Sequence, residues 1–241
     1  MSTIVALSFL LAFTQSLFGV GLLMLGTPLL LALGFDFIEV QNALLPASVF
    51  LSLLQCWDLR FEGSTRASRR IVLLAALPAL ALGIFLSAQF SAGMYLRPLV
   101  TAMLGFGILL RLSGEGPRER IRCLFARFET PTLFLTGLVH GLSNMGGPLL
   151  VTLAAGRYRS PRAYLALVSF AYALMASTQL LGLALKAQLE LDPLQVLAQC
   201  AAVYAAKLMV SATLKALATR PLYQQLLTGL MALNLIALTL R

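Results

Sequence analysis

Two interruptions by glycine and proline occur in sequence that is otherwise apolar enough for membrane helices. They run over residues 21–28 and 141–148, and both have the spacing Gly-x4-Gly-x-Pro followed by two leucines. In bilayer hydrocarbon every backbone polar group needs a partner inside the protein, so a broken helix is tolerated only where protein or a protected cavity surrounds it. Breaks at corresponding places in two halves of a chain point to a binding site between the halves.

The composition places nearly the whole chain in a lipid bilayer. Of its 241 residues 59% are hydrophobic and 11% are charged, and the mean hydropathy is +0.89. A soluble domain has about 25% charged residues, so the sequence predicts a polytopic membrane protein without a separate soluble domain. The net charge of +9 is explained by basic cytoplasmic loops rather than by a nucleic-acid partner.

The apolar segments follow the same order in two halves of the chain, separated by a polar linker. The first repeat, residues 1–112, comprises a broken hairpin at 1–34 and spans at 38–57, 71–91 and 97–111, with a kink expected at Pro78. The linker covers residues 113–129. The second repeat, residues 130–241, comprises a broken hairpin at 130–155 and spans at 162–185, 193–214 and 221–240.

The distribution of Lys and Arg predicts the orientation of these segments. Most basic residues fall in the loops at 58–70, 111–129, 157–162 and 215–220, which we therefore place in the cytoplasm. They are Arg60, Arg66, Arg69, Arg70, Arg111, Arg118, Arg120, Arg122, Arg127, Arg157, Arg159, Arg162, Lys215 and Arg220, which leaves Arg97, Lys186 and Arg241 outside. Each half then has an odd number of crossings, so the predicted fold is all-α with two inverted repeats, and the two breaks meet near the midplane.

The chemistry available inside the membrane favours an anion. Every Asp and Glu lies in or at the edge of a loop, which weighs against a metal-cation transporter and against proton coupling through a carboxylate. Broken helices present free N–H groups and the positive end of the helix dipole, which suit an anion. The sequence contains no Ser-His-Asp set, metal-ligand cluster or phosphate-binding loop, so we expect neither an enzyme nor a cofactor.

The candidate substrate-binding residues lie at the two breaks, with one cation in a later span. They are Gly21, Gly26, Thr27, His140, Ser143, Asn144, Gly146, Gly147 and Lys207. For the polar residues at the second break two interpretations stay open, a contact with the ligand or a hydrogen bond to backbone freed by the break. Lys207 either pairs with an anion or extends to the inner surface. Other polar residues of the spans line the path or join helices, namely Asn42, Ser48, Gln55, Ser169, Tyr172, Ser177 and Gln179, while Gln15 and Ser16 face the same cavity as the breaks.

The two breaks resemble those of the TauE/SafE sulfite exporter family. The resemblance rests on Phe18-Gly19-Val20-Gly21 before Pro28, and on Gly141-Leu142-Ser143-Asn144-Met145-Gly146-Gly147-Pro148. It extends over nearly the whole chain in size and two-half layout. It implies secondary transport of sulfite, organosulfonates or related small anions. The first motif departs from the family pattern, because Leu22 and Leu23 stand where the family often has glycine.

The sequence thus predicts a transporter that carries a small, sulfur-containing anion across an inner membrane by alternating access. Two alternatives stay open: a transporter of another solute, such as a carboxylate or a metal cation, and a membrane enzyme or assembly factor without transport. The coupling ion, the direction of flux and the oligomeric state, including a homodimer, are also left open by the sequence.

Overall fold

The computed structural model describes residues 2–19, 21–60, 62, 65–90, 92–210 and 221–240. Within these ranges the regular structure is helical and no strand is present. The first half contains α1 (Ser2–Phe18), α2 (Leu22–Leu33), α3 (Phe37–Asp58), α4 (Arg66–Ile71), the π-helical turn η2 (Val72–Ala76), α5 (Leu77–Gln89) and α6 (Ala92–Leu112). After α7 (Glu115–Arg127) follow α8 (Glu129–Ser143), α9 (Gly147–Arg157), α10 (Pro161–Leu185), α11 (Pro193–Met209) and α13 (Pro221–Thr239).

Four helices within the described residues are long and apolar enough to cross a membrane. They cover Phe37–Asp58, Arg66–Gln89, Met94–Leu112 and Pro161–Leu185, and shorter apolar helices accompany them. The second of these joins α4, η2 and α5 into one helix. Pro78, where a kink is predicted, is the second residue after the π-helical turn, as expected where a missing N–H disturbs the helical ladder. The predicted all-α polytopic membrane fold is confirmed.

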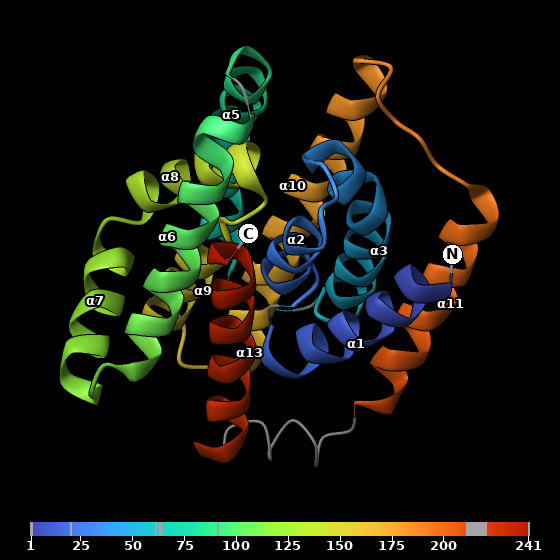
Figure 1. Ribbon diagram of the computed structural model, residues 1–241. Helices are drawn as coiled ribbons and strands as arrows, with labels where there is room; N and C mark the ends of the chain where they lie inside the picture. The colour runs from blue at the N-terminus through green and yellow to red at the C-terminus, as the bar shows by residue number, and fades with distance from the viewer. Residues whose placement is uncertain are drawn as a thin grey trace.

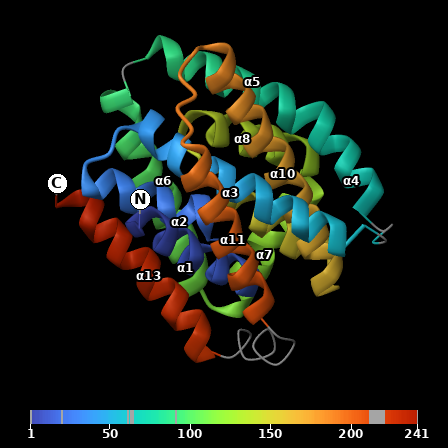
Figure 2. The same ribbon diagram turned by 90° about the vertical axis from the view of Figure 1, so that its right-hand side faces the viewer.

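The helices of the two halves interlock around an antiparallel pair formed by α3 and α10 (Figures 1 and 2). The first helix of each half packs on the other half: α1 lies along α11, and α8 lies along η2 and α5. Glycines allow the close approach of α8. A Cβ on Gly137 would collide with the carbonyl oxygen of Ala76, and one on Gly83 would lie 3.0 Å from the Cα of Gly141. Small residues that bring two backbones together are typical of helix packing in membranes.

The first hairpin breaks earlier than the sequence predicts. Helix α1 ends at Phe18 and α2 begins at Leu22, whereas Gly26 and Pro28 lie inside α2. The interruption predicted over residues 21–28 is therefore wrong at Gly26 and Pro28, whereas Gly21 does lie at the observed break. The reversal needs a left-handed residue, which Gly19 supplies with φ 79°. Pro28 withholds only one N–H from the helix, a loss that surrounding helices can accommodate in a membrane protein.

The second hairpin breaks within the predicted motif. Helix α8 ends at Ser143 and α9 begins at Gly147, and Asn144 between them has φ 61°. A residue with positive φ thus stands two positions before a glycine in both breaks, as Gly19-x-Gly21 and as Asn144-x-Gly146.

The observed reversal of the first hairpin at Gly19 does not lie beside the second break, although Thr27 of the first predicted motif does contact Asn144 at 3.5 Å. A Cβ on Gly19 would lie 3.1 Å from Leu165 near the start of α10, whereas Asn144 is hydrogen-bonded to Gln179 near its end. The 14 positions between Leu165 and Gln179 correspond to about 21 Å along the helix. The repeated motif aligns Gly21 with Gly141 in sequence. The observed helices instead make Gly21 correspond to Gly146, because these two glycines precede α2 and α9.

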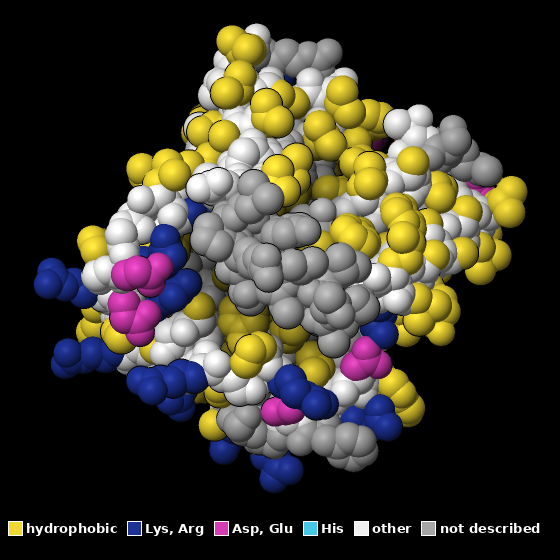
Figure 3. Space-filling view, turned by 90° about the horizontal axis from the view of Figure 1, so that it is seen from below, with side chains coloured by type: hydrophobic (Ala, Val, Ile, Leu, Met, Phe, Trp, Pro, Cys, Tyr) yellow, Lys and Arg dark blue, Asp and Glu magenta, His cyan; other side chains and the backbone are white. Residues whose placement is uncertain are grey.

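Charged side chains gather at the end of the molecule that carries α7 (Figure 3). The predicted linker forms the exposed helix α7, which packs against α9. Nearby, Arg162 pairs with Glu62 at 3.0 Å and Arg157 pairs with Glu129 at 3.5 Å. The predicted loop at 215–220, the end of the predicted span 193–214, and Arg241 lie outside the described residues.

Candidate functional site at the second helix break

Asn144 is the centre of a buried hydrogen-bond network at the second break. Its Oδ1 atom accepts a bond of 2.7 Å from Nε2 of Gln179 on α10 and a longer one of 3.5 Å from Nε2 of Gln41 on α3. Its Nδ2 atom donates to Oγ1 of Thr27 on α2 at 3.5 Å. Side chains from α2, α3 and α10, and so from both halves of the chain, therefore contact Asn144 at the end of α8.

Several polar atoms around Asn144 are buried without a hydrogen-bond partner in the described part of the chain. They are Nδ1 and Nε2 of His140, the hydroxyl oxygen of Tyr172 and Oε1 of Gln179. The rings of His140 and Tyr172 stand edge to face, with 5.8 Å between their centroids. Each unpartnered buried polar atom costs about 1–3 kcal/mol, so a cluster of four is well suited to hydrogen bonding with a small polar ligand.

Two glycines let the start of α9 approach this cluster closely. A Cβ on Gly147 would collide with the hydroxyl of Tyr172, and a Cβ on Gly146 would lie 2.8 Å from Cβ of His140. Helix α9 has no side-chain cap at its N-terminus, so the N–H groups of its first turn have no partner within the helix, except at Pro148, which has no N–H. Free N–H groups and the positive helix end favour negative charge at this point.

Two pockets approach the break from opposite ends of the molecule. A pocket of about 420 Å³ opens between α3, α5 and α10 near Asp36 and Lys186, and Gln41 and Gln179 are part of its lining. A second pocket of about 800 Å³ lies among α6, α7, α9 and α13 and reaches Met24 and Pro148. Because Gln179 contacts Asn144 and Pro148 follows the break, residues 144–148 lie between the two pockets.

The predicted site residues fall into two groups. Thr27, His140, Asn144, Gly146 and Gly147 come together around the break. Ser143 lies in the same segment, but its hydroxyl donates to the carbonyl of Val139 at 2.8 Å and accepts from the N–H of Met145 at 3.3 Å. It satisfies backbone groups that the break would otherwise leave free.

The remaining predicted residues lie elsewhere. A Cβ on Gly21 or Gly26 would contact Leu11 of α1 at 2.5 or 2.8 Å, so both glycines allow the hairpin helices to pack. Lys207 forms an ion pair of 2.7 Å with Asp58 at the end of α3. Asp58 is 17 positions beyond Gln41, or about 25 Å along the helix. Gln15, which was expected to face the breaks, accepts a bond from the N–H of Leu22 at the first break.

Sequence reasoning missed Gln41 and gave Tyr172 and Gln179 only a general role in the path. Tyr172 and Gln179 are seven positions apart, which places them on one face of α10. That spacing can be read from the sequence. The sequence does not show that this face of α10 packs against His140 and Asn144 at the second break. Gln41 carries no local signal, because only the packing of α3 against α10 brings it to Asn144.

Comparison with known proteins gives one family. The family model described as sulfite exporter TauE/SafE matches residues 4–241. Among curated proteins and solved structures, none matches the chain significantly. The match covers essentially the whole chain, and the chain therefore belongs to the TauE/SafE sulfite exporter family.

Proposed function

We propose that this chain is a secondary transporter of a small anion, sulfite or an organosulfonate, and that the anion binds at the second helix break. The observation that carries the proposal is the buried group of donors at the break, namely the hydroxyl of Tyr172, which has no partner among the described residues, and the amide nitrogen of Asn144, which has only a bond of 3.5 Å. Membership of a sulfite exporter family supports transport as the activity.

The proposed site favours an anion by its donors. The amide of Asn144, the hydroxyl of Tyr172 and the N–H groups at the start of α9 can all donate to oxyanion oxygens. None of the side chains that we place at the site is a carboxylate, and the nearest acidic residue in either adjoining pocket is Asp36 at the mouth of the smaller one. Neutral donors bind a small anion without the penalty of burying an additional charge.

The placement of the two pockets supports alternating access as the proposed mechanism. We propose that the pocket near Asp36 and Lys186 opens to the outside and that the pocket near α7 opens to the cytoplasm of a cell with an inner membrane. The break between them would then be exposed to one pocket at a time. The corresponding order of elements in the two halves supports an inverted repeat, in which one half moves against the other.

A flux assay tests this proposal. The full-length protein in phosphatidylcholine liposomes should carry sulfite across the bilayer, and protein-free liposomes should not. Taurine-like sulfonates, small carboxylates and divalent metals should be offered as competitors. Competition by sulfonates alone supports the proposed substrate class, whereas competition by carboxylates or metals would favour another solute. No flux of any of these compounds would contradict transport at this site.

A further inference from the structure

The larger pocket has the lining of an anion site in its own right. It is lined by three arginines, Arg111 at the end of α6 and Arg118 and Arg122 on α7, and by no Asp or Glu among the described residues. The polar side chains of Thr152, Gln225 and Thr228 complete the lining together with glycines and apolar residues. We propose that this pocket binds an oxyanion group, a sulfate-, sulfonate- or phosphate-type head, at a site separate from the second helix break.

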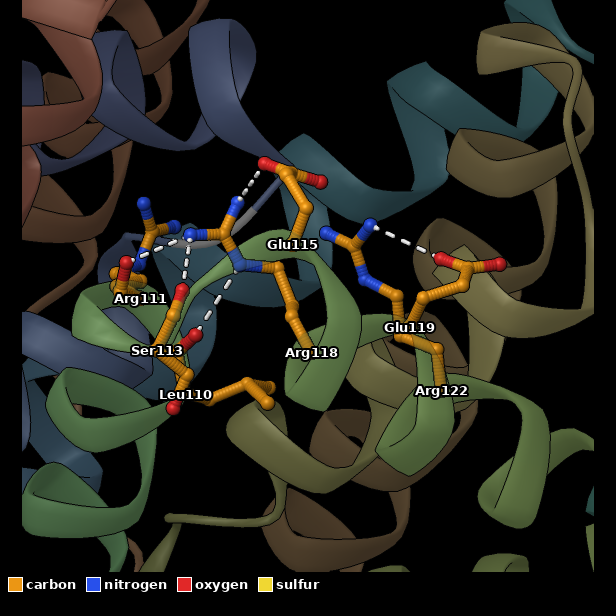
Figure 4. A network of polar contacts seen from close by, with 7 residues as sticks. All are labelled: Leu110, Arg111, Ser113, Glu115, Arg118, Glu119 and Arg122. Carbon is orange, nitrogen blue, oxygen red and sulfur yellow. Dashed lines mark hydrogen bonds and ion pairs between the residues drawn. The ribbon is translucent and has the colours of Figure 1, made fainter.

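Arg118 fixes the corner between α6 and α7 (Figure 4). Its guanidinium donates to the backbone carbonyls of Leu110 at 3.2 Å, Arg111 at 2.8 Å and Ser113 at 2.9 Å, and to Glu115 at 3.0 Å. The last carbonyls of α6 are thereby satisfied by a cation, which the helix dipole also favours. Arg118 therefore fixes the start of α7 against the end of α6, which carries Arg111, and most of its own donors are already used.

Arg122 is available to an anion. Its ion pair with Glu119 is 3.7 Å long, and the Glu119 side chain is 63% exposed. An ion pair with such an exposed partner contributes about 0–1 kcal/mol, so an oxyanion can compete for the guanidinium at little cost. Figure 4 shows the guanidinium groups of Arg111, Arg118 and Arg122 in a row on the same side of the α6–α7 corner. Planar guanidinium groups bind oxyanions through paired N–H bonds.

The apolar part of the lining strengthens this attraction. Ile108, Val151 and Met231 line the same pocket, and charges act more strongly on one another where such walls exclude water. The oxyanion group that the pocket binds could come from either of two sources. A free oxyanion could enter from solution, or the phosphate of an anionic lipid could enter with its acyl chains among the helices, as basic pockets between membrane helices allow.

The binding experiment has one arm for each source. The full-length protein is placed in phosphatidylcholine nanodiscs and titrated with radiolabelled sulfate. Separately, protein purified from membranes that contain phosphatidylglycerol is examined for retained lipid by native mass spectrometry. Arg122→Gln and Arg111→Gln remove the proposed ligands. Arg120→Gln is the matched control, because Arg120 is exposed on the same helix and does not line the pocket.

We expect Arg122→Gln to weaken either sulfate binding or retention of phosphatidylglycerol by about tenfold, and Arg120→Gln to leave both unchanged. Loss in the sulfate arm identifies a free oxyanion as the ligand, and loss in the lipid arm identifies the lipid phosphate. Equal behaviour of Arg122→Gln and Arg120→Gln in both arms would overturn the proposal. Arg122 lies on an exposed helix, so its variant stays informative even if Arg111→Gln does not fold.

A variant at the second break distinguishes binding in the larger pocket from binding at the proposed transport site. Asn144→Gly should keep the binding that Arg122→Gln removes, because Asn144 does not line the larger pocket. If Asn144→Gly alone abolishes all sulfate and lipid binding, the binding belongs to the break and the separate pocket site is refuted.

Discussion

Gln179 is hydrogen-bonded through one nitrogen both to the last turn of α8 and to Asn144, the first residue of the second helix break. Its Nε2 atom lies 2.7 Å from Oδ1 of Asn144, which follows α8, and 3.1 Å from the carbonyl oxygen of His140, which precedes the end of that helix. These bonds orient the amide of Asn144 with its oxygen toward α10 and its nitrogen toward Thr27. The nitrogen makes only a long bond of 3.5 Å, so it can donate to a ligand.

Replacing Gln179 by leucine should loosen the break. The change removes the 2.7 Å bond to Asn144 and leaves its buried Oδ1 atom with only the 3.5 Å bond from Gln41, and a poorly paired buried polar atom costs about 1–3 kcal/mol. We expect a lower midpoint of thermal unfolding in detergent and a sulfite flux reduced by about tenfold. Ser177→Leu, two positions away on an exposed part of α10, is the control and should change neither quantity. Wild-type flux in Gln179→Leu would show that the orientation of Asn144 is unimportant.

Gly147 and Tyr172 should behave as a coupled pair. A Cβ on Gly147 would collide with the Tyr172 hydroxyl, so Gly147→Ala should displace the ring and reduce both stability and flux. Adding Tyr172→Phe removes the obstructing oxygen. A double-mutant cycle on the midpoint of thermal unfolding should show that the second change restores part of the loss. Additive losses in the double variant would mean that the collision is relieved in another way.

Lys207 should not determine the affinity for substrate. It pairs with Asp58 about 25 Å from Gln41 along α3, and charges at that distance are screened over a Debye length of about 8 Å. Lys207→Gln should therefore change the KM for sulfite by less than about twofold, as should the charge-conserving Lys207→Arg. A rise of about tenfold in KM for Lys207→Gln alone would return Lys207 to the substrate path.

Cysteine labelling tests the proposed orientation. Cys123 is exposed on α7, at the end that we place in the cytoplasm. With Cys56 and Cys200 replaced by serine, a membrane-impermeant maleimide should label Cys123 only after the cells are permeabilised. A cysteine introduced as Glu190→Cys into the otherwise cysteine-free chain should be labelled in intact cells, since Glu190 is exposed at the opposite end. The reverse pattern would invert the orientation.

The positions of the membrane helices were largely predictable from the sequence, because hydrocarbon demands long apolar segments. The region predicted as the span 162–185 corresponds to α10 at Pro161–Leu185. The second break was also predictable, since Asn144, Gly146, Gly147 and Pro148 are adjacent in the chain. The interaction of Asn144 with Gln179 and Gln41 was not, because it depends on how α3 and α10 pack.

The first break is misplaced because Pro28 was expected to interrupt the helix. Pro28 instead lies within α2, and the chain reverses at Gly19, which has a φ of 79°. The signal common to both breaks is a residue able to adopt positive φ, followed two positions later by glycine. Glycine and asparagine both tolerate that conformation, so Gly19-x-Gly21 and Asn144-x-Gly146 could have been aligned from the sequence.

Sulfite flux by Asn144→Gly shows whether the amide of Asn144 binds the substrate. Glycine retains the positive φ of 61° that position 144 requires, so this change removes the amide and keeps the backbone of the break. We expect a folded protein with a wild-type elution profile and a sulfite kcat/KM lowered by at least about tenfold. A folded Asn144→Gly protein that carries sulfite with the wild-type kcat/KM would show that the anion does not bind at the second break.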